Sequence, residues 1–322
     1  MTVRIGFIGA GGIAHHHMEN LAKIPSAKMV AFMDVRKEAA DECAGKYSAK
    51  AFTDYRKMLK EVPMDAVYVC VPPNAHGDME IDAARKGLHL FVEKPVNIDV
   101  KKALAAADAI DKAGVIAAVG YSLRYLPFFE QLRAVLSQSP MRQAVVTRWG
   151  SLPKNSWWRV MASSGGQLVE MVTHQIDLLR GVAGEIESVA AVYSYDDLGA
   201  PDADVPSHYN VVMEIEGGAA AVFSTSCMSP SGKNDMVMVT PKAVVEVNYS
   251  KGVTVRPEGA LPVPELVQGP SIDECFVKAV ETKDRSGLKS EYRDAVRSLA
   301  VSIACNVSAK ERRVVEVDEL ME

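Results

Sequence analysis

Cysteine is scarce in this chain of 322 residues, which has five, at positions 43, 70, 227, 275 and 305. None of them forms a Cys-x-x-Cys pair, and their number is odd. The spacing therefore predicts neither a disulfide framework nor a zinc site, and it fits a reducing, cytoplasmic setting.

Positive charge is also in short supply, because 36 Lys and Arg stand against 41 Asp and Glu and the net charge is -5. Such a chain has no basic surplus with which to neutralise nucleic-acid phosphates. Long apolar runs are missing too, and none reaches the ~18 residues that a membrane-spanning helix requires. We therefore expect a protein that binds neither nucleic acid nor membrane.

An alternation of short apolar runs and helical patterns occupies residues 1–121. The apolar runs, each interpreted as a buried strand, are 3–8, 29–33, 66–71, 89–92 and 115–119. Helical patterns separate them, for example at 13–24, 79–86 and 100–112. Continuous apolar strands that alternate with helices are typical of a parallel sheet covered on both faces. The sequence therefore predicts an α/β domain over 1–121, with a doubly wound sheet of the Rossmann type.

Residues 122–322 follow a different pattern. Apolar and polar residues alternate from His208 to Glu216, and Gly217-Gly218 then fits the tight turn of a hairpin. This predicts an α+β domain with a mostly antiparallel, open sheet, which we expect to bind substrate. Helices on one side of such a sheet leave its other face to be buried, so a homo-oligomer is expected.

A glycine turn joins the first predicted strand to the first helix. Gly9, Gly11 and Ala14 fit the pattern G-x-G-x-x-G/A, and Gly12 and Ile13 open the helix. Gly9 permits the tight turn, Gly11 lets the backbone approach a pyrophosphate, and the helix N-terminus offers free N–H groups to the anion. The pattern predicts a nicotinamide dinucleotide at this turn.

An acidic residue, Asp34, ends the second predicted strand about 20 residues after the glycine turn, as the ribose-binding carboxylate of such sites does. Its negative charge favours NAD over NADP. Arg36 is nearby, however, and an arginine at this place can receive the 2′-phosphate of NADP, which stays the alternative.

Three consecutive histidines, His15, His16 and His17, raise the question of a metal site. Neighbours on a helix point in different directions, so the three cannot face one ion. We predict no metal here.

Two further loops follow predicted strands. Pro72, Asn74 and His76 follow the third strand, and Glu93 and Lys94 follow the fourth. Carboxyl ends of parallel strands meet at one edge of a sheet, where ligands of open α/β sheets bind. We therefore expect Lys94 at the same edge as the glycine turn, although a lysine after a strand is more often an ordinary surface residue.

Several stretches together resemble the glucose–fructose oxidoreductase / inositol dehydrogenase / MocA (Gfo/Idh/MocA) family. They are the glycine turn at 9–14, Pro72-Pro73-Asn74-Ala75-His76, Glu93-Lys94-Pro95, Gly120 to Tyr125, and Gly165 to Leu178 with its His174-Gln175-Ile176-Asp177-Leu178 element. The resemblance covers nearly the whole chain, and it implies NAD(P)-dependent oxidation of a sugar or polyol hydroxyl. It also implies that the oligomer is a homodimer or homotetramer.

The resemblance also implies roles for individual residues. Lys94 matches the lysine that reaches the substrate hydroxyl, and His174 matches the usual proton acceptor. Glu170 stands where the family often has an aspartate, four residues before the histidine. The carboxylate is kept, but the side chain is longer by one methylene, and a catalytic role for Glu170 requires that the longer side chain still fits. The residues expected to bind the cofactor are Gly9, Gly11, Gly12, Ile13, Asp34, Arg36, Pro72, Asn74, His76, Glu93 and Lys94.

Helical spacing is consistent with these roles, because Gln167, Glu170, His174 and Asp177 follow one another at intervals of three, four and three residues. On one helix they would form a single polar stripe, which by itself is more often a solvated face. We expect Asp177 to be structural. Histidine, with an ordinary pKa near 6.5, suits the task of taking a proton from an alcohol, and a lysine ammonium favours the developing alkoxide.

A second group of residues is expected to contact the carbohydrate. Trp158 and Arg159 offer an aromatic ring for C–H faces and a donor for hydroxyls, although a core tryptophan is an equal alternative. Tyr121 and Arg124, at the start of the second domain, are assigned here with Lys94 and His174 as substrate-binding residues.

Two other functions fit the same resemblance. One is an NAD-dependent glycosidase, in which a transient hydride transfer permits elimination and no net NADH forms. The other is a non-catalytic sensor that binds NAD and a partner protein, against which the presence of Lys94 and His174 argues. Net turnover separates the first function from the glycosidase, and absence of turnover favours the sensor.

Overall fold

Six parallel strands form the first sheet of the computed structural model, which describes residues 2–322. The strands are β1 (Val3–Ile8), β2 (Ala27–Met33), β3 (Lys50–Phe52), β4 (Ala66–Val69), β5 (His89–Val92) and β6 (Ala117–Val119). Their order is β3-β2-β1-β4-β5-β6, and every pair is parallel. This confirms the predicted doubly wound sheet. The order reverses between β1 and β4, and ligands of such sheets bind beside that point, at the carboxyl ends of the strands.

Helices cover both faces of this sheet, and its strands are therefore buried on both sides. They are α1 (Gly12–Leu21), α2 (Lys37–Tyr47), α3 (Tyr55–Glu61), α4 (Asp78–Arg85), α5 (Val100–Ala113) and α10 (Ile272–Thr282), with the short 3-10 helix η1 (Pro73–Ala75). No local pattern in the sequence predicted β3, α2 or α3. The run 37–47 is mostly charged or alanine, so it carries little of the apolar periodicity that signals a helix.

The chain divides into two compact units. The first comprises residues 1–97, 101–121 and 270–296, and the second comprises 98–100, 122–269 and 297–322. Residues 270–296 thus join the first unit, whereas the linear division at residue 121 places them in the second. The reason is the packing of α10 on α1 and β1, where the Phe276 ring meets the rings of Tyr68 and Phe91 at centroid distances of 5.5 Å and 5.6 Å.

Eight strands form the sheet of the second unit, in the order β13-β12-β11-β7-β10-β9-β8-β14. They are β7 (Gln143–Ser151), β8 (Ile186–Ser194), β9 (His208–Ile215), β10 (Ala219–Ser226), β11 (Met228–Val239), β12 (Val244–Asn248), β13 (Gly252–Arg256) and β14 (Val315–Glu316). Only the pair β10 and β7 is parallel. The predicted hairpin is present, with Gly217 and Gly218 at φ +79° and +78° between β9 and β10.

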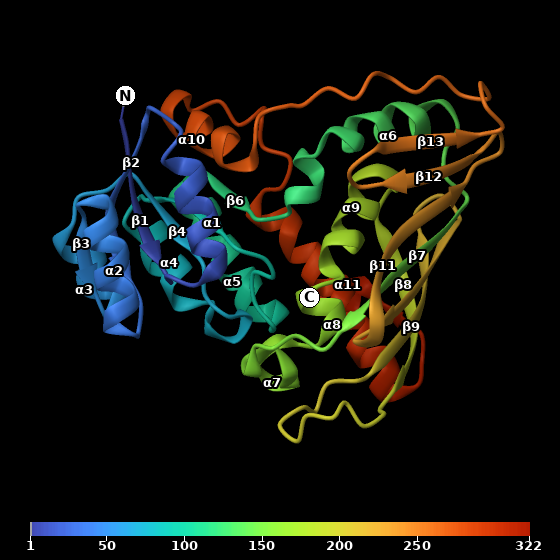
Figure 1. The fold of residues 1–322 in the computed structure, drawn as a ribbon, viewed down its shortest axis with the longest axis horizontal. Helices are drawn as coiled ribbons and strands as arrows, with labels where there is room; N and C mark the ends of the chain where they lie inside the picture. The colour runs from blue at the N-terminus through green and yellow to red at the C-terminus, as the bar shows by residue number, and fades with distance from the viewer. Residues whose placement is uncertain (1) are drawn as a thin grey trace. The chain divides into compact units, whose positions relative to one another are not determined.

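Helices lie on one side of this second sheet, as Figure 1 shows for α9 and α11. The helices of the unit are α6 (Pro127–Gln138), α7 (Met161–Ser164), α8 (Gln167–Glu170), α9 (Thr173–Ala183) and, from residue 297 onward, α11 (Tyr292–Glu311), with the 3-10 helices η2 (Ser122–Tyr125), η3 (Ser156–Arg159) and η4 (Val317–Leu320). Residues of β9 alternate between buried and exposed, so one face belongs to the core. The other face exposes Val145, Val212 and Val222, which are cross-strand neighbours.

Within residues 2–322, none of the helices combines the length and the apolar character needed to cross a membrane.

Candidate functional site

The glycine turn of the first unit is shaped by close backbone contact. Gly9 has φ +96°, and a Cβ there would lie 2.2 Å from the carbonyl oxygen of Cys70, so only glycine fits. A Cβ added at Gly11 or Gly12 would meet nothing within 4 Å. Helix α1 begins at this open space, and no side chain caps its first N–H groups. Open space before free helical N–H groups is what a pyrophosphate requires, so the turn fits a dinucleotide.

The carboxylate of Asp34 is held beside this turn. One oxygen accepts the N–H of Ala10 at 2.9 Å, and the other accepts the N–H of Arg36 at 2.9 Å. Each oxygen keeps a further lone pair for a ribose hydroxyl. The exposed Arg36 guanidinium lies 3.5 Å from the same carboxylate. The arrangement fits NAD, and the arginine is placed where it could offset the charge that opposes NADP.

The loop after β4 combines exposed and anchored residues. Pro72 and Asn74 are exposed, whereas His76 is buried. The Nδ1 atom of His76 lies 2.5 Å from the buried carboxylate of Glu80, and its carbonyl oxygen accepts the Asn97 amide at 3.0 Å. His76 therefore anchors the loop, and its predicted contact with cofactor stays a prediction.

The turn after β5 is fixed by a buried carboxylate. Glu93 is 6% exposed, and its Oε2 atom accepts the N–H of Lys94 at 3.2 Å. A Cβ at Gly120 would lie 2.3 Å from Glu93 Oε1, so glycine is required for the carboxylate to sit there. Lys94 itself is half-buried. The structure thus places Lys94 at the carboxyl edge of the sheet, which also carries the glycine turn.

The three histidines of α1 have three different environments. His15 is half-buried, His16 is exposed and His17 is buried. The ring of His17 contacts two carboxylates, with Nδ1 2.8 Å from Asp273 and Nε2 2.9 Å from Glu93. Sequence reasoning missed this cluster, because Asp273 is 256 residues away from His17 and no local pattern links them.

The polar residues 167–177 of the second unit do not share one helix. Helix α8 ends at Glu170 and α9 begins at Thr173, so the predicted continuous stripe is wrong. The side chain of Gln167 is buried and bonds Thr225 and the backbone of Ser226, each at 3.1 Å. His174 is half-buried in the first turn of α9. The stripe is therefore not a solvated face.

Glu170 contacts a residue that the sequence assigned to substrate. The indole N–H of Trp158 donates to Glu170 Oε2 at 2.6 Å. Trp158 is 2% exposed and packs with Val205 and Cys227, so of its two interpretations the structure shows the core tryptophan. Arg159 donates to the backbone of Pro153 at 2.9 Å and pairs with Asp202 at 3.3 Å, which gives this arginine a local role.

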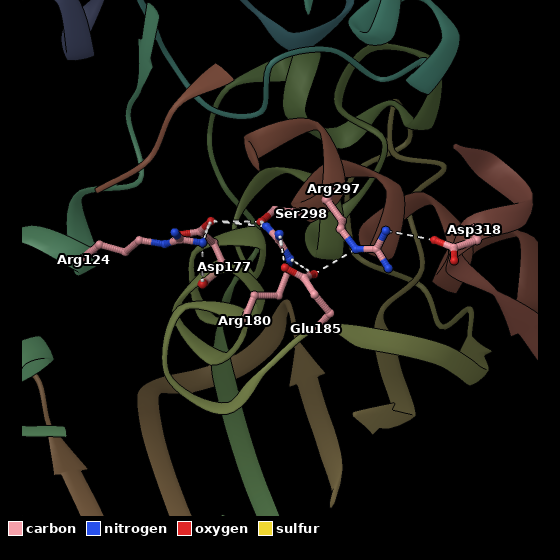
Figure 2. Close-up of polar contacts among 7 residues, drawn as sticks. All are labelled: Arg124, Asp177, Arg180, Glu185, Arg297, Ser298 and Asp318. Carbon is pink, nitrogen blue, oxygen red and sulfur yellow. Dashed lines mark hydrogen bonds and ion pairs between the residues drawn. The ribbon is translucent and has the colours of Figure 1, made fainter. Parts of the chain in front are cut away.

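Asp177 and Arg124 form a buried ion pair (Figure 2). Two guanidinium nitrogens of Arg124 donate to the two carboxylate oxygens of Asp177, each at 2.7 Å, and Ser298 donates to Asp177 at 2.9 Å. This agrees with a structural Asp177. Arg124 is 8% exposed and Tyr121 is fully buried, so the structure lends no support to their predicted contact with substrate.

Comparison with known proteins identifies relatives of both halves of the chain. Residues 3–121 match the family model of the NAD-binding Rossmann fold of an oxidoreductase family, and residues 140–254 match the GFO/IDH/MocA C-terminal domain.

Two curated relatives are inositol dehydrogenases by name. The chain is 30% identical over 247 residues to myo-inositol 2-dehydrogenase of Thermotoga maritima, covering 74% of this chain and 72% of the relative. It is 29% identical over 246 residues to scyllo-inositol 2-dehydrogenase (NAD(+)) of Bacillus subtilis, covering 71% of this chain and 69% of the relative.

A solved structure shares the fold. The WlbA dehydrogenase of Bordetella pertussis, determined in complex with NADH and UDP-GlcNAcA, superposes with a TM-score of 0.87 at 19% identity, covering 98% of this chain and 99% of the other.

Proposed function

Because the chain belongs to the Gfo/Idh/MocA family of oxidoreductases, we propose that it oxidises a hydroxyl of a sugar, polyol or inositol-like carbohydrate with NAD. The observation that carries the proposal lies within the first unit. One sheet edge bears a glycine turn open to a pyrophosphate, a carboxylate oriented at Asp34, and Lys94 held by Glu93. That combination would hold a nicotinamide dinucleotide, which is the hydride acceptor, and it offers a cation for an alcohol oxygen at the edge where such sheets bind ligands.

The residues have separate tasks in this reaction. The glycine turn and Asp34 would hold NAD, which would supply the acceptor for the hydride that leaves the carbon bearing the hydroxyl. His174 accepts the hydroxyl proton as general base, for which a half-buried imidazole is suited. The ammonium of Lys94 stabilises the alkoxide oxygen as it forms. Glu170, held by the Trp158 N–H, is proposed to orient His174.

NAD is proposed as the cofactor in preference to NADP. The Asp34 carboxylate, fixed by the backbone of Ala10, offers its lone pairs to two ribose hydroxyls and repels a 2′-phosphate. Replacing Asp34 by Ala should raise the KM for NAD and lower the ratio of kcat/KM for NAD over NADP. An unchanged ratio would contradict this assignment.

Absorbance of reduced nicotinamide tests the proposal directly. Purified protein is mixed with NAD or NADP and a panel of inositols, sugars and sugar acids. We expect reduction with at least one panel member, lost in Lys94→Ala and in His174→Ala, and retained in Lys112→Ala, an exposed lysine at the end of α5. Release of sugar without net reduction would favour the glycosidase, and cofactor binding without any turnover would favour the sensor.

We also propose that the protein acts as a homo-oligomer in the cytoplasm. The uncovered face of the second sheet exposes Val145, Val192, Val212 and Val222, with exposed fractions of 44%, 70%, 49% and 37%. An apolar row of this kind is typical of an interface. Light scattering should give a multiple of the 34.8 kDa chain mass, reduced toward one chain in Val212→Lys. All five cysteines are buried and none is paired with another in the described residues.

A further inference from the structure

His17 occupies an ionic cluster that the proposed reaction does not use. It lies in α1, five residues after the glycine of the helix start, and only 3% of it is exposed. Each ring nitrogen lies within hydrogen-bond distance of a carboxylate, Nδ1 at 2.8 Å from Asp273 and Nε2 at 2.9 Å from Glu93. Only the doubly protonated ring can donate to both carboxylates at once. The geometry therefore favours an imidazolium over a neutral ring.

The other groups around the ring support that charge. Asp273 is fully buried and also accepts the Asn20 amide at 2.9 Å and the Tyr68 hydroxyl at 3.1 Å. Burial raises the pKa of the Tyr68 phenol and of the nearby Cys70 thiol well above their ordinary values, so both stay neutral. Within the described cluster, His17 therefore supplies the one positive charge between two carboxylates.

Electrostatics agree with the geometry. Burial opposes the charged form of His17, but the hydrogen bonds and charges of Asp273 and Glu93 outweigh it and raise the pKa of the imidazole to about 9. The ring thus stays charged throughout the neutral range. His16, its exposed neighbour on the same helix, contacts it only at ring edges, with centroids 5.8 Å apart.

The cluster is connected to Lys94 through Glu93. One carboxylate oxygen of Glu93 binds His17, and the other accepts the backbone N–H of Lys94 at 3.2 Å. Gly120 closes the third side, because a Cβ there would lie 2.3 Å from the carboxylate. A shift of Glu93 would therefore move the backbone from which the Lys94 side chain projects. The same histidine sits on α1, whose N-terminus forms the cofactor turn.

We propose that His17 is a positioning residue for Lys94: as an imidazolium it bridges Glu93 and Asp273, and so fixes the turn that carries the lysine relative to the cofactor helix. This inference rests on the proposed function of Lys94. It assigns to the first unit a charge that must be present for turnover, although His17 touches neither the reacting carbon nor its hydroxyl.

The charge state can be tested without any turnover. Nitrogen-15 NMR of histidine side chains should show one ring, absent in His17→Gln, that stays doubly protonated through neutral pH and titrates only as the pH approaches about 9. In Asp273→Asn the same ring should titrate at a lower pH, because one carboxylate is gone. If the His17 ring were neutral at a pH of about 7, its pKa would be that of an ordinary histidine, and the proposal would be overturned.

Kinetics test the positioning role. In His17→Gln we expect kcat to fall between about 10-fold and 100-fold, the effect of a misplaced catalytic group, while the KM for NAD changes little. Because the variant lacks the ring whose pKa is about 9, it should also lack the alkaline decline of kcat that is expected of the wild type. His16→Gln is the matched control and should keep the wild-type kcat and pH profile.

The outcomes of these experiments distinguish the positioning role of His17 from the proposed dehydrogenase activity. Turnover by the wild type with an unaltered kcat and pH profile in folded His17→Gln would refute the positioning role and leave the dehydrogenase intact. Absence of turnover by the wild type would refute the dehydrogenase, and the NMR titration would still decide the charge state. If His17→Gln does not fold, Asp273→Asn replaces it, with an alkaline decline of kcat expected at lower pH than in the wild type; an unchanged profile would overturn the proposal.

Discussion

Each unit of the molecule contains an ionic cluster with buried members, and the two clusters are built from different cations. In the first unit, the single imidazolium of His17 lies between the carboxylates of Glu93 and Asp273. In the second, Figure 2 shows three guanidiniums that alternate with three carboxylates: Arg124, Asp177, Arg180, Glu185, Arg297 and Asp318. A guanidinium is charged at every pH at which proteins fold, whereas an imidazolium is not.

This difference indicates a division of labour. The arginine cluster ties α9 to α11 through Arg180, which donates to Ser298 at 2.6 Å, and the charge of its guanidiniums does not change with pH. The histidine cluster contacts the turn that carries Lys94, so its charge is connected to the proposed reaction. Histidine is the cation that links stability and activity to pH.

Removing the central carboxylate of the arginine cluster should have the largest effect. Asp177→Ala leaves the buried Arg124 guanidinium without the carboxylate that binds both its nitrogens, which we expect to cost about 3–5 kcal/mol of unfolding free energy. All three tryptophans, Trp149, Trp157 and Trp158, lie in the second unit, so urea unfolding followed by tryptophan fluorescence reports this unit alone.

The control lies in the same cluster. Asp318 pairs with Arg297, but its side chain is 76% exposed, so Asp318→Ala should cost less than about 1 kcal/mol. Equal losses in the two variants would mean that burial does not decide the strength of this cluster.

Alkaline pH should affect the histidine cluster and not the arginine cluster. The pKa of His17 rises from 6.5 in the unfolded chain to about 9 in the folded one, so its stabilisation is complete below pH 6.5 and is lost as the pH rises through about 9. The shift corresponds to roughly 3 kcal/mol. Urea unfolding followed by circular dichroism should show that the free energy of unfolding decreases less at alkaline pH in His17→Gln than in the wild type. A tryptophan-fluorescence transition that shifted by the same amount would contradict the contrast between the units.

Crowding the carboxylate should weaken the histidine cluster without removing a charge. In Gly120→Ala the new Cβ would lie 2.3 Å from Glu93 Oε1, so the carboxylate must move, at a cost of about 1–3 kcal/mol and with reduced kcat. Gly45→Ala is the matched control, because Gly45 is in helix α2 with nothing within 4 Å of an added Cβ. That change should stabilise by about 0.5–1 kcal/mol. A stabilised and fully active Gly120→Ala would show that Glu93 is not held in place.

The smallest effect is expected from a polar contact that lies in neither cluster. Trp158→Phe keeps an aromatic ring in the core but removes the N–H that Glu170 accepts at 2.6 Å. Because Glu170 is half-buried and water can replace the donor, we expect a loss of about 1 kcal/mol and a few-fold lower kcat. If Trp158→Phe lowered kcat as much as Glu170→Ala does, the reaction would need the Trp158–Glu170 hydrogen bond and not the carboxylate alone.

Local patterns were enough to predict most of the fold. Val3–Ile8 and His89–Val92 are strands with the predicted bounds. Each is a short apolar run next to a helical pattern, and such a run is typical of a buried strand. The antiparallel second sheet followed in the same way from the alternation around Tyr209. Lys50–Phe52 was missed because a strand of three residues is too short for its period to be visible.

The site was predicted less completely, for a physical reason. The glycine turn, Asp34 and Lys94 are defined by their order along the chain, so sequence placed them at one sheet edge. The partners that hold them are not local: Asp273 reaches His17 from α10, and Arg124 reaches Asp177 from 53 residues before it. The interruption between α8 and α9 was also invisible, because Met171 and Val172 continue the apolar pattern of a helix.

The return of α10 to the first unit has a consequence for how the protein is made. A chain leaves the ribosome N-terminus first, so β1 to β6, the glycine turn and Lys94 exist before residue 273 has been synthesised. Until then Glu93 and His17 lack their third member, and the rings of Tyr68 and Phe91 lack the cover of Phe276. The first unit can therefore complete its core only after α10 has been synthesised, near the end of translation. A product truncated before α10 would leave these rings exposed, and exposed apolar surface is what chaperones bind.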